Sequence, residues 1–204
     1  MPDKPPSIRE RQAQLTRDEI LKAARLLFAD RGYTRTSVRD IAMAAGVSAQ
    51  TVYDSIGSKQ ALVQRLNDLI DEEADVFAIA RASTGSDDPA QVASTSAKIT
   101  RSILEHCGDI LHAVVTGASA EPDLQVVLDE GHKRHVGGAR IAIERLRAMN
   151  ALTESMDVDE AVEALAAVTD IQFALLLRDS YGWSADRIES WLAGISQDLL
   201  LRRG

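Results

Sequence analysis

Cysteine, aromatic residues and long apolar runs are all scarce in this sequence. A single cysteine, Cys107, excludes an internal disulfide framework and a multi-cysteine zinc site. No uncharged apolar run approaches the ~18 residues that a membrane-spanning helix requires. The first seven residues hold three prolines, an acid and a lysine, where a secretory signal would be apolar. We therefore expect a cytoplasmic protein that needs no membrane and no cofactor.

Positive charge is also in deficit, because the net charge is −8. The deficit is uneven: residues 1–65 carry 11 Lys and Arg against 7 Asp and Glu, whereas residues 66–204 carry 12 against 24. Such an asymmetry indicates a basic head on an acidic body. Salt screens charges beyond roughly 8–10 Å, so the acidic body does not prevent the head from binding nucleic acid.

What the sequence does contain is helical periodicity, and no alternating strand pattern of any length accompanies it. We predict an all-α fold of about nine helices. The proline-rich, charged residues 1–14 are expected to form a disordered arm, followed by a small helical domain at 15–60 and a larger one at 61–204. The cations of the arm are either solvated or placed against phosphates: Lys4, Arg9 and Arg11.

Capping and breaking signals predict where the helices end. Thr16–Glu19 and Asp157–Glu160 have the pattern of capping boxes, which start helices. The loop composition of residues 83–89 and the glycine at Gly108 predict interruptions.

Residues 37–56 form the most informative segment. Two short helical patterns are joined by a turn in which Gly46 permits a left-handed backbone, Val47 fills the gap and Ser48 starts the second helix. This is a helix-turn-helix by length, turn and pattern, and its second helix would enter the DNA major groove. The alternative is a short helical hairpin in an ordinary bundle.

The polar side chains of this segment suit contacts with DNA. The amide of Gln50 could pair with adenine, Thr51 could touch a base edge or a thymine methyl, and Tyr53 adds a hydroxyl. Thr36 and Lys59 flank the segment at helix N-termini, where backbone amides attract phosphate.

The same region carries a family resemblance, in five spaced motifs: Gly32-Tyr33, Thr36–Ala42, Ala44–Ser48, Thr51–Tyr53 and Gly57–Leu62. These resemble the DNA-binding domain of the tetracycline-repressor (TetR) family. The one departure is Ser55-Ile56, where the family usually has an aromatic residue or histidine followed by Phe.

The resemblance implies an Ω-shaped homodimer, a ligand cavity in the C-terminal domain and release from a palindromic operator when the ligand binds. It places residues of the recognition helix at Ser48, Gln50, Thr51 and Tyr53, and phosphate-contacting residues at Thr36 and Lys59. The predicted function is a transcriptional regulator, most simply a repressor, and not an enzyme. The alternative is a DNA-binding regulator that is controlled by a protein partner or has no small-molecule switch.

Polar residues within apolar segments, together with nearby aromatic residues, are the candidates for binding a small ligand. A buried polar group without a partner costs roughly 1–3 kcal/mol, and a ligand could supply that partner. The predicted ligand-binding residues are Phe77, His106, His112, Gln172 and Phe173.

The last two long helical patterns predict a dimer interface. The helix expected at 158–180 is apolar on two sides, and the final helix carries an apolar stripe, so two subunits could form a four-helix bundle. The predicted interface residues are Val168, Leu175, Ile188, Trp191, Leu192 and Ile195.

Two other interpretations of the histidines are weaker. His132 and His135 have the spacing of metal ligands, but no third ligand follows at a readable spacing, so no metal site is predicted. Cys107 lies between His106 and His112, yet no motif brings a nucleophile, a base and oxyanion donors together, so no catalytic residue is predicted.

Overall fold

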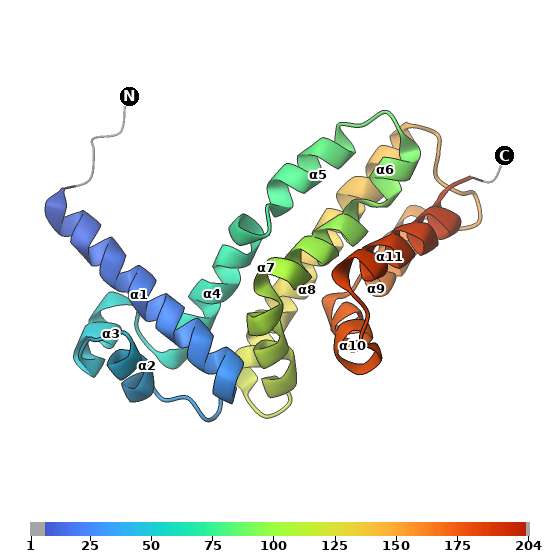
Figure 1. The fold of residues 1–204 in the computed structure, drawn as a ribbon. Helices are drawn as coiled ribbons and strands as arrows, with labels where there is room; N and C mark the ends of the chain where they lie inside the picture. The colour runs from blue at the N-terminus through green and yellow to red at the C-terminus, as the bar shows by residue number, and fades with distance from the viewer. Residues whose placement is uncertain (1–6, 203–204) are drawn as a thin grey trace. The chain divides into compact units, whose positions relative to one another are not determined.

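The computed structural model describes residues 7–202, and every regular element in this part of the chain is a helix, which confirms the all-α prediction (Figure 1). In chain order the helices are α1 (Ile8–Arg31), α2 (Val38–Ala44), α3 (Ala49–Ser55), α4 (Lys59–Glu73), α5 (Val76–Thr84), α6 (Pro89–Ala93), α7 (Thr95–Gly117), α8 (Pro122–Ala148), α9 (Val158–Val168), α10 (Ile171–Tyr181) and α11 (Ala185–Leu200). No helix within residues 7–202 is both long and apolar enough to cross a membrane.

The chain divides into two compact units, each assembled from two stretches. The first unit contains the residues up to Asp68 together with Asp109–Leu128, and the second contains Leu69–Gly108 together with the residues from Asp129 onward. The boundaries therefore fall inside α4, α7 and α8. The single division predicted after residue 60 follows chain order, and chain order does not reveal that a later segment packs with the first unit.

Helices α1, α2 and α3 pack against one another and form what we call the head of the first unit (Figure 1). Each contributes fully or almost fully buried apolar side chains at helical spacing: Ile20, Ala24, Phe28, Ile41 and Val52. Leu62 of α4 is equally buried. The head is thus organised by a single small core, which orients α3 relative to α1 and α2.

Helix α1 begins earlier than the sequence indicated. The backbone N–H of Glu10 donates to Ser7 Oγ at 3.3 Å, and the Ser7 N–H donates to the Glu10 carboxylate at 2.7 Å, which is a complete capping box. Thr16 lies inside the helix, and its hydroxyl donates to a carbonyl one turn earlier. The predicted disordered arm is therefore wrong for residues 8–14, because strong helix formers follow a satisfied cap; its residues 1–6 lie outside the described part.

One further predicted helix start is confirmed, and one predicted helix break is wrong. The capping box at Asp157 and Glu160 is present. Gly108 does not interrupt α7; the guanidinium of Arg178 occupies the space beside it, and a Cβ at Gly108 would clash with Arg178 Nη1. The glycine therefore permits a close approach and does not break the helix.

Three unexpected interruptions split predicted helices instead. Asp75 has φ 50° between α4 and α5, Ser94 ends α6, and Asp170 caps α10 by accepting a hydrogen bond from the backbone of Gln172. The Ser94 and Asp170 side chains hydrogen-bond to the backbone and so compete with helical hydrogen bonds, whereas Asp75 makes no side-chain cap; such local effects escape a periodicity argument. They account for eleven helices in residues 7–202, where about nine were expected.

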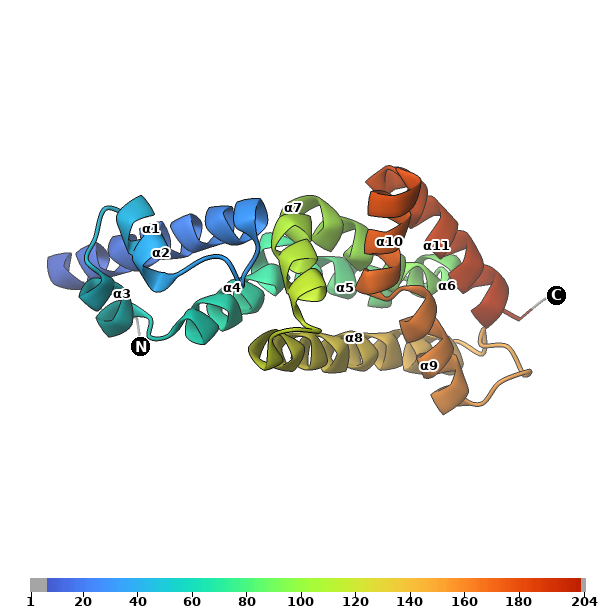
Figure 2. The same cartoon turned by 90° about the horizontal axis from the view of Figure 1, so that it is seen from below.

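The second unit has its own core, formed where α6, α8, α9 and α11 meet (Figure 2). Fully or almost fully buried residues from all four helices make up this core, among them Val92, Ile143, Leu165 and Leu200. The stripe of α11 is therefore occupied by its own chain along part of its length.

Candidate nucleic-acid interface

The turn between α2 and α3 has the geometry of a helix-turn-helix. Gly46 has φ 69°, a left-handed backbone that a side chain would oppose. The Val47 N–H donates to the carbonyl of Ala42 at 3.0 Å, and the Ser48 hydroxyl caps α3 by accepting from the Thr51 N–H at 3.0 Å. The predicted roles of these three turn residues in the local fold are confirmed.

The outer face of α3 is polar and accessible. Val52 is the buried residue of this helix, whereas Gln50 is exposed and Tyr53 is 52% exposed. Gln50 Nε2 donates to the carboxylate of Asp54 at 2.7 Å, so the acid next to it orients the amide. One N–H of that amide and its oxygen are left for a base edge, which is the donor and acceptor pair that adenine accommodates.

The side chain of Thr36 is used within the protein. Its side chain is 2% exposed, and its hydroxyl donates to the carbonyls of Gly32 at 2.9 Å and Leu27 at 3.2 Å. The helix cap of α2 is Ser37, one residue later. The prediction of a phosphate contact is therefore wrong for the Thr36 side chain, which instead ties the end of α1 to the start of α2.

Lys59 binds the protein itself. Its Nζ donates to the carbonyls of Tyr33 at 2.9 Å and Thr36 at 3.1 Å, and lies 3.9 Å from the centroid of the Tyr33 ring. Burial lowers the pKa of Lys59. The negative charges of Glu121 and Asp123 act in the other direction and only partly offset it. An ammonium group has three donors, so Lys59 braces the head and retains one N–H for a phosphate.

Tyr33 connects the head to the second stretch of the same unit. Its buried ring lies 5.3 Å from Phe28, and its hydroxyl donates to Asp123 Oδ2 at 3.4 Å. Burial, reinforced by the charges of Asp123 and Glu121, raises the pKa of Tyr33 to about 12. A second connection, between Arg25 and Asp109, joins α1 to the same stretch.

Two residues on the outer face of α2 were missed by the sequence analysis. Arg39 is exposed and makes no hydrogen bond or ion pair with any of residues 7–202, and Met43, one turn later, is 77% exposed. Their i, i+4 spacing opposite the buried Ile41 and Ala42 is the signal that could have identified them.

The predicted ligand-binding residues are not gathered in an enclosed site. Phe77 is 67% exposed on α5, and His106, His112 and Gln172 are also exposed, so the expectation of buried polar groups is wrong for these three. Phe173 packs on Trp191, with ring centroids 5.8 Å apart. An amphipathic surface position and a core position look alike within a short apolar segment, which is why the pattern misled.

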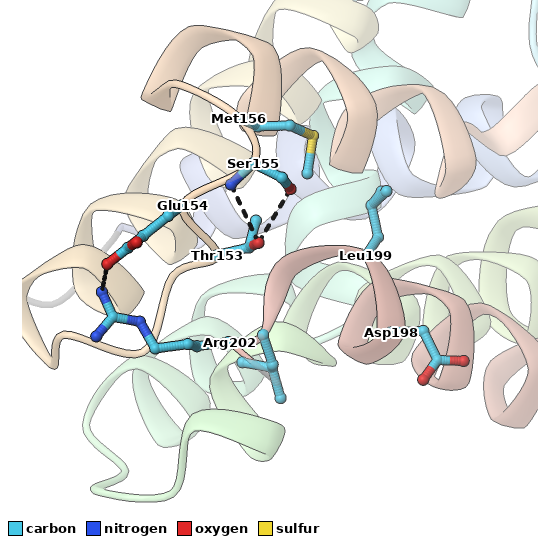
Figure 3. Close-up of a pocket in the computed structure, with 8 residues that line it drawn as sticks. Thr153, Glu154, Ser155, Met156, Asp198, Leu199 and Arg202 are labelled. Carbon is cyan, nitrogen blue, oxygen red and sulfur yellow. Dashed lines mark hydrogen bonds and ion pairs between the residues drawn. The ribbon is translucent and has the colours of Figure 1, made fainter. Parts of the chain in front are cut away.

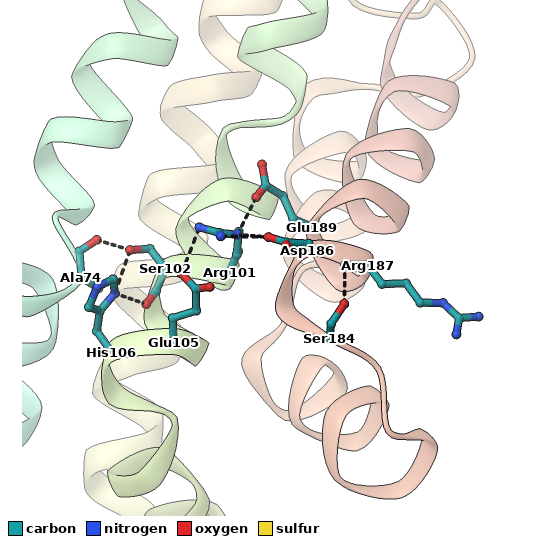
Figure 4. A network of polar contacts seen from close by, with 9 residues as sticks. All are labelled: Ala74, Arg101, Ser102, Glu105, His106, Ser184, Asp186, Arg187 and Glu189. Carbon is teal, nitrogen blue, oxygen red and sulfur yellow. Dashed lines mark hydrogen bonds and ion pairs between the residues drawn. The ribbon is translucent and has the colours of Figure 1, made fainter.

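A polar network explains where His106 points (Figure 4). Its Nδ1 lies 2.8 Å from the carbonyl of Ser102, whose hydroxyl donates to the Ala74 carbonyl left free at the α4–α5 break. One turn away, Arg101 forms ion pairs with Glu105 of its own helix and, in α11, with Asp186 at 2.8 Å and Glu189 at 3.1 Å. These contacts fasten α7 to its neighbours within the second unit.

A solvent-open depression of about 780 Å³ lies elsewhere in the second unit, between the loop preceding α9 and the end of α11 (Figure 3). Its lining includes the hydroxyls of Thr153 and Ser155, the apolar Met156 and Leu199, and Arg202, which pairs with Glu154. None of the predicted ligand-binding residues belongs to it.

Of the predicted dimer residues, three are covered by their own chain. Ile188 and Leu192 are fully buried and Leu175 is 4% exposed, so the prediction that they face a partner is wrong for these side chains. The i, i+4 spacing of Ile188 and Leu192 places them on the same, buried side of α11. Trp191 is 38% exposed, and Val168 and Ile195 are half-buried.

The exposed part of α10 and α11 is an aromatic patch. Trp191 stacks edge-on against Trp183 at 5.6 Å, and Leu176 and Tyr181 of α10 are exposed. Arg187 lies 3.9 Å above the Trp183 ring. We call the three rings in contact, Phe173, Trp183 and Trp191, the aromatic patch.

The two histidines of α8 take separate partners. His135 is held at 3.1 Å from the Ala166 carbonyl and 3.2 Å from the Thr169 hydroxyl, and burial lowers its pKa. His132 lies 3.8 Å from the carboxylate of Asp170.

Comparison with known proteins places this helix-turn-helix in a family. The model of bacterial regulatory proteins of the tetR family matches residues 20–66. A relative described as the probable HTH-type transcriptional regulator ArpR of Pseudomonas putida is 33% identical over 196 residues, covering 89% of this chain and 90% of ArpR.

Solved structures agree with the fold. NalD, the secondary repressor of the MexAB-OprM multidrug efflux pump in Pseudomonas aeruginosa, superposes with a TM-score of 0.72 at 22% identity, covering 94% of this chain and 100% of NalD. A transcriptional regulator from Saccharomonospora viridis in complex with choline has a TM-score of 0.71 at 20% identity, over 93% of this chain and 100% of that one.

The fold and the exposed α3 define a helix-turn-helix DNA-binding regulator. The chain belongs to the TetR family of transcriptional regulators, whose members are DNA-binding proteins and not enzymes. The family prediction made from the five motifs is thus confirmed.

Proposed function

We propose that this protein is a homodimeric repressor that binds a palindromic DNA operator in the cytoplasm and leaves it when a small molecule binds the second unit. The observation that carries the proposal is α3, which is capped and anchored by Val52 and presents Gln50 and Tyr53 outward. A helix of this kind fits the major groove, which is about 12 Å wide.

The residues proposed to contact DNA divide by role. In this proposal Gln50, Thr51 and Tyr53 read base edges, whereas Arg39 and the remaining N–H of Lys59 meet phosphates. Ser48 acts mainly through the cap of α3, because its hydroxyl lies 2.8 Å from Thr51 Oγ1 and accepts the Thr51 N–H.

The proposed dimer surface is the aromatic patch with the half-buried Val168 and Ile195. A monomer rarely leaves a contiguous apolar patch beyond roughly 300–600 Å² exposed, and a second copy would cover it. A two-fold pair of subunits also presents two recognition helices about 34–36 Å apart, one DNA turn, which is what a palindrome requires.

Ligand control is proposed to reach the head through the stretch Asp109–Leu128. This stretch belongs to α7 and α8 and touches the head through the Arg25–Asp109 pair and the Tyr33–Asp123 hydrogen bond. The choline-bound neighbour is consistent with a fold that holds a small molecule. A coupling of about 1–3 kcal/mol between the sites would change operator affinity 5–150-fold.

The test is in vitro selection of duplexes from a random pool, followed by binding measurements on the selected and a scrambled duplex. We expect a palindromic site, and we expect Gln50→Ala to alter preference at one position per half-site at a cost of roughly 1–3 kcal/mol. Equal losses of affinity on both duplexes would contradict the role of Gln50. A selected site without two-fold symmetry would contradict the dimeric arrangement.

A further inference from the structure

The first turns of α1 have an inner face that residues 7–202 cover only in part. Residues 8–19 precede the part of the chain that matches the family model. Within α1, the face that buries Ile20, Ala24 and Phe28 continues towards the N-terminus at helical spacing through Arg17, Thr16, Ala13 and Arg9. Along this face Ile20 is fully buried, Arg17 and Thr16 are half-buried, and Ala13 and Arg9 are exposed.

The chemistry of that face changes where its burial ends. The fully buried residues are apolar, whereas the half-buried and exposed ones are a small residue, a hydroxyl and two guanidinium groups. A helix face that packs against another protein surface is expected to be apolar. Small side chains between cations instead suit the approach of a DNA backbone, since arginine makes charge-assisted hydrogen bonds with phosphate oxygens.

The two arginines are available for such contacts. Arg9 is exposed and pairs with no residue among 7–202. Arg17 is oriented by its neighbour Gln14, whose Oε1 accepts from Arg17 Nε at 3.1 Å and Nη2 at 2.8 Å, while Gln14 Nε2 donates to Asp18 at 2.7 Å. Arg17 is thus partly immobilised and still has unused N–H donors.

The first turns of α1 have a position and a length that suit contact with the DNA backbone beside α3. Both views show the start of α1 projecting past α3 within the first unit (Figures 1 and 2). Twelve helical residues extend about 18 Å at about 1.5 Å per residue, which is roughly half a DNA turn. In helix-turn-helix proteins the first helix of the motif, here α2, crosses the DNA backbone, and α1 packs against α2.

We propose that the first turns of α1 are a second DNA-binding site, in which Arg9 and Arg17 bind the phosphates that flank the major groove entered by α3. This inference rests on the proposed function. The site contributes affinity and register without reading bases, so it lengthens the contacted duplex beyond the half-site.

The test compares Arg9→Ala/Arg17→Ala with the wild-type chain on the selected duplex, provided with long flanks, and on its scrambled counterpart. Alanine favours a helix, so circular dichroism should show α1 intact. The variant removes four arginine–phosphate interactions from each dimer, which should reduce the magnitude of the slope of log K against log salt by about 3.6, at about 0.9 per neutralised phosphate. Hydroxyl-radical protection should shrink at both outer edges of the footprint.

Two matched variants test whether the effect depends on where the arginines lie and on their positive charge. Arg81→Ala/Arg147→Ala removes two exposed arginines of the second unit and should leave the slope and footprint unchanged. Arg9→Lys/Arg17→Lys keeps the charges and should restore most of the slope.

Two results would overturn the inference: an unchanged slope and footprint in Arg9→Ala/Arg17→Ala, or an equal change in the Arg81 and Arg147 control. If Gln50→Ala shifts base preference while the α1 variant behaves as wild type, DNA binding through α3 stands and the second site does not. If the wild-type chain binds no duplex at all, the proposed function fails and the inference fails with it.

Discussion

Arg25 of α1 and Asp109 of α7 form a two-bond ion pair: Arg25 Nε donates to Asp109 Oδ2 and Nη2 to Oδ1, each at 2.8 Å. The two residues are 84 positions apart in the sequence. Bidentate guanidinium–carboxylate pairs fix orientation as well as distance. The pair therefore sets how the stretch Asp109–Leu128 meets the recognition head.

Asp109→Asn should weaken this connection in a pH-dependent way. Burial alone would raise the pKa of Asp109, but hydrogen bonds from Arg25 and the Ile110 backbone, and the Arg25 charge, hold it below its ordinary value. A lowered folded pKa contributes stability above the unfolded value, about 3.9, and that stability is lost as the pH falls further.

Because the pair is partly solvent-exposed, we expect Asp109→Asn to cost less than about 1 kcal/mol at neutral pH. Urea unfolding at neutral and acidic pH should show the difference from wild type shrinking below about pH 4. A difference that does not vary with pH would contradict the role given to the carboxylate.

Tyr33→Phe should change the response to alkali. Burial favours the neutral phenol in the folded state, so its contribution to stability is present below the unfolded pKa, about 10, and is lost as the pH rises towards 12. Unfolding midpoints across this interval should fall less steeply in Tyr33→Phe than in wild type. Equal slopes in Tyr33→Phe and wild type would contradict the role given to the buried phenol.

Lys59→Met should destabilise the free protein before DNA is added. Methionine keeps an apolar stem but removes the donors to the Tyr33 and Thr36 carbonyls, at a cost of about 1–3 kcal/mol. Chemical unfolding measures this loss directly. Lys22→Met, at an exposed position of α1, should be close to neutral, and equal effects of the two substitutions would refute the bracing role.

Adjacent substitutions on α11 should have opposite outcomes. Trp191→Arg should yield a folded monomer, because part of the ring is exposed in the aromatic patch, whereas Leu192→Arg should unfold the chain by placing a charge in its core. Sedimentation and circular dichroism on the same samples distinguish the two results. A Trp191→Arg protein that remains dimeric would remove the aromatic patch from the interface.

The recognition helix and its turn were predictable from sequence because their determinants are local. Gly46, Val47 and Ser48 act within a few residues of themselves, and the alternation between the buried Val52 and its polar neighbours follows from helical spacing. The start of α1 was missed although its signal, Ser7 with Glu10, is also local, because the later Thr16–Glu19 pattern competes with it and prolines precede Ser7.

Roles that depend on distant partners were not predictable. Thr36 and Lys59 bear the expected residue types, but their polar groups are used by carbonyls at Gly32 and Tyr33, which only the folded head brings close. Likewise, the apolar stripe on α11 correctly predicted that Leu192 is on a buried face. It did not reveal whether that face packs against the same chain or against a second subunit. Periodicity identifies a buried face, whereas the partner depends on the tertiary arrangement.

The discontinuous first unit has a consequence for how the protein is made. Residues up to Asp68 leave the ribosome first, but the Asp109–Leu128 stretch that supplies partners for Arg25 and Tyr33 emerges only after Leu69–Gly108 of the other unit. The head therefore cannot acquire its complete set of contacts until translation has passed Leu128. A nascent chain that stalls earlier would display α3 without the contacts proposed to control it.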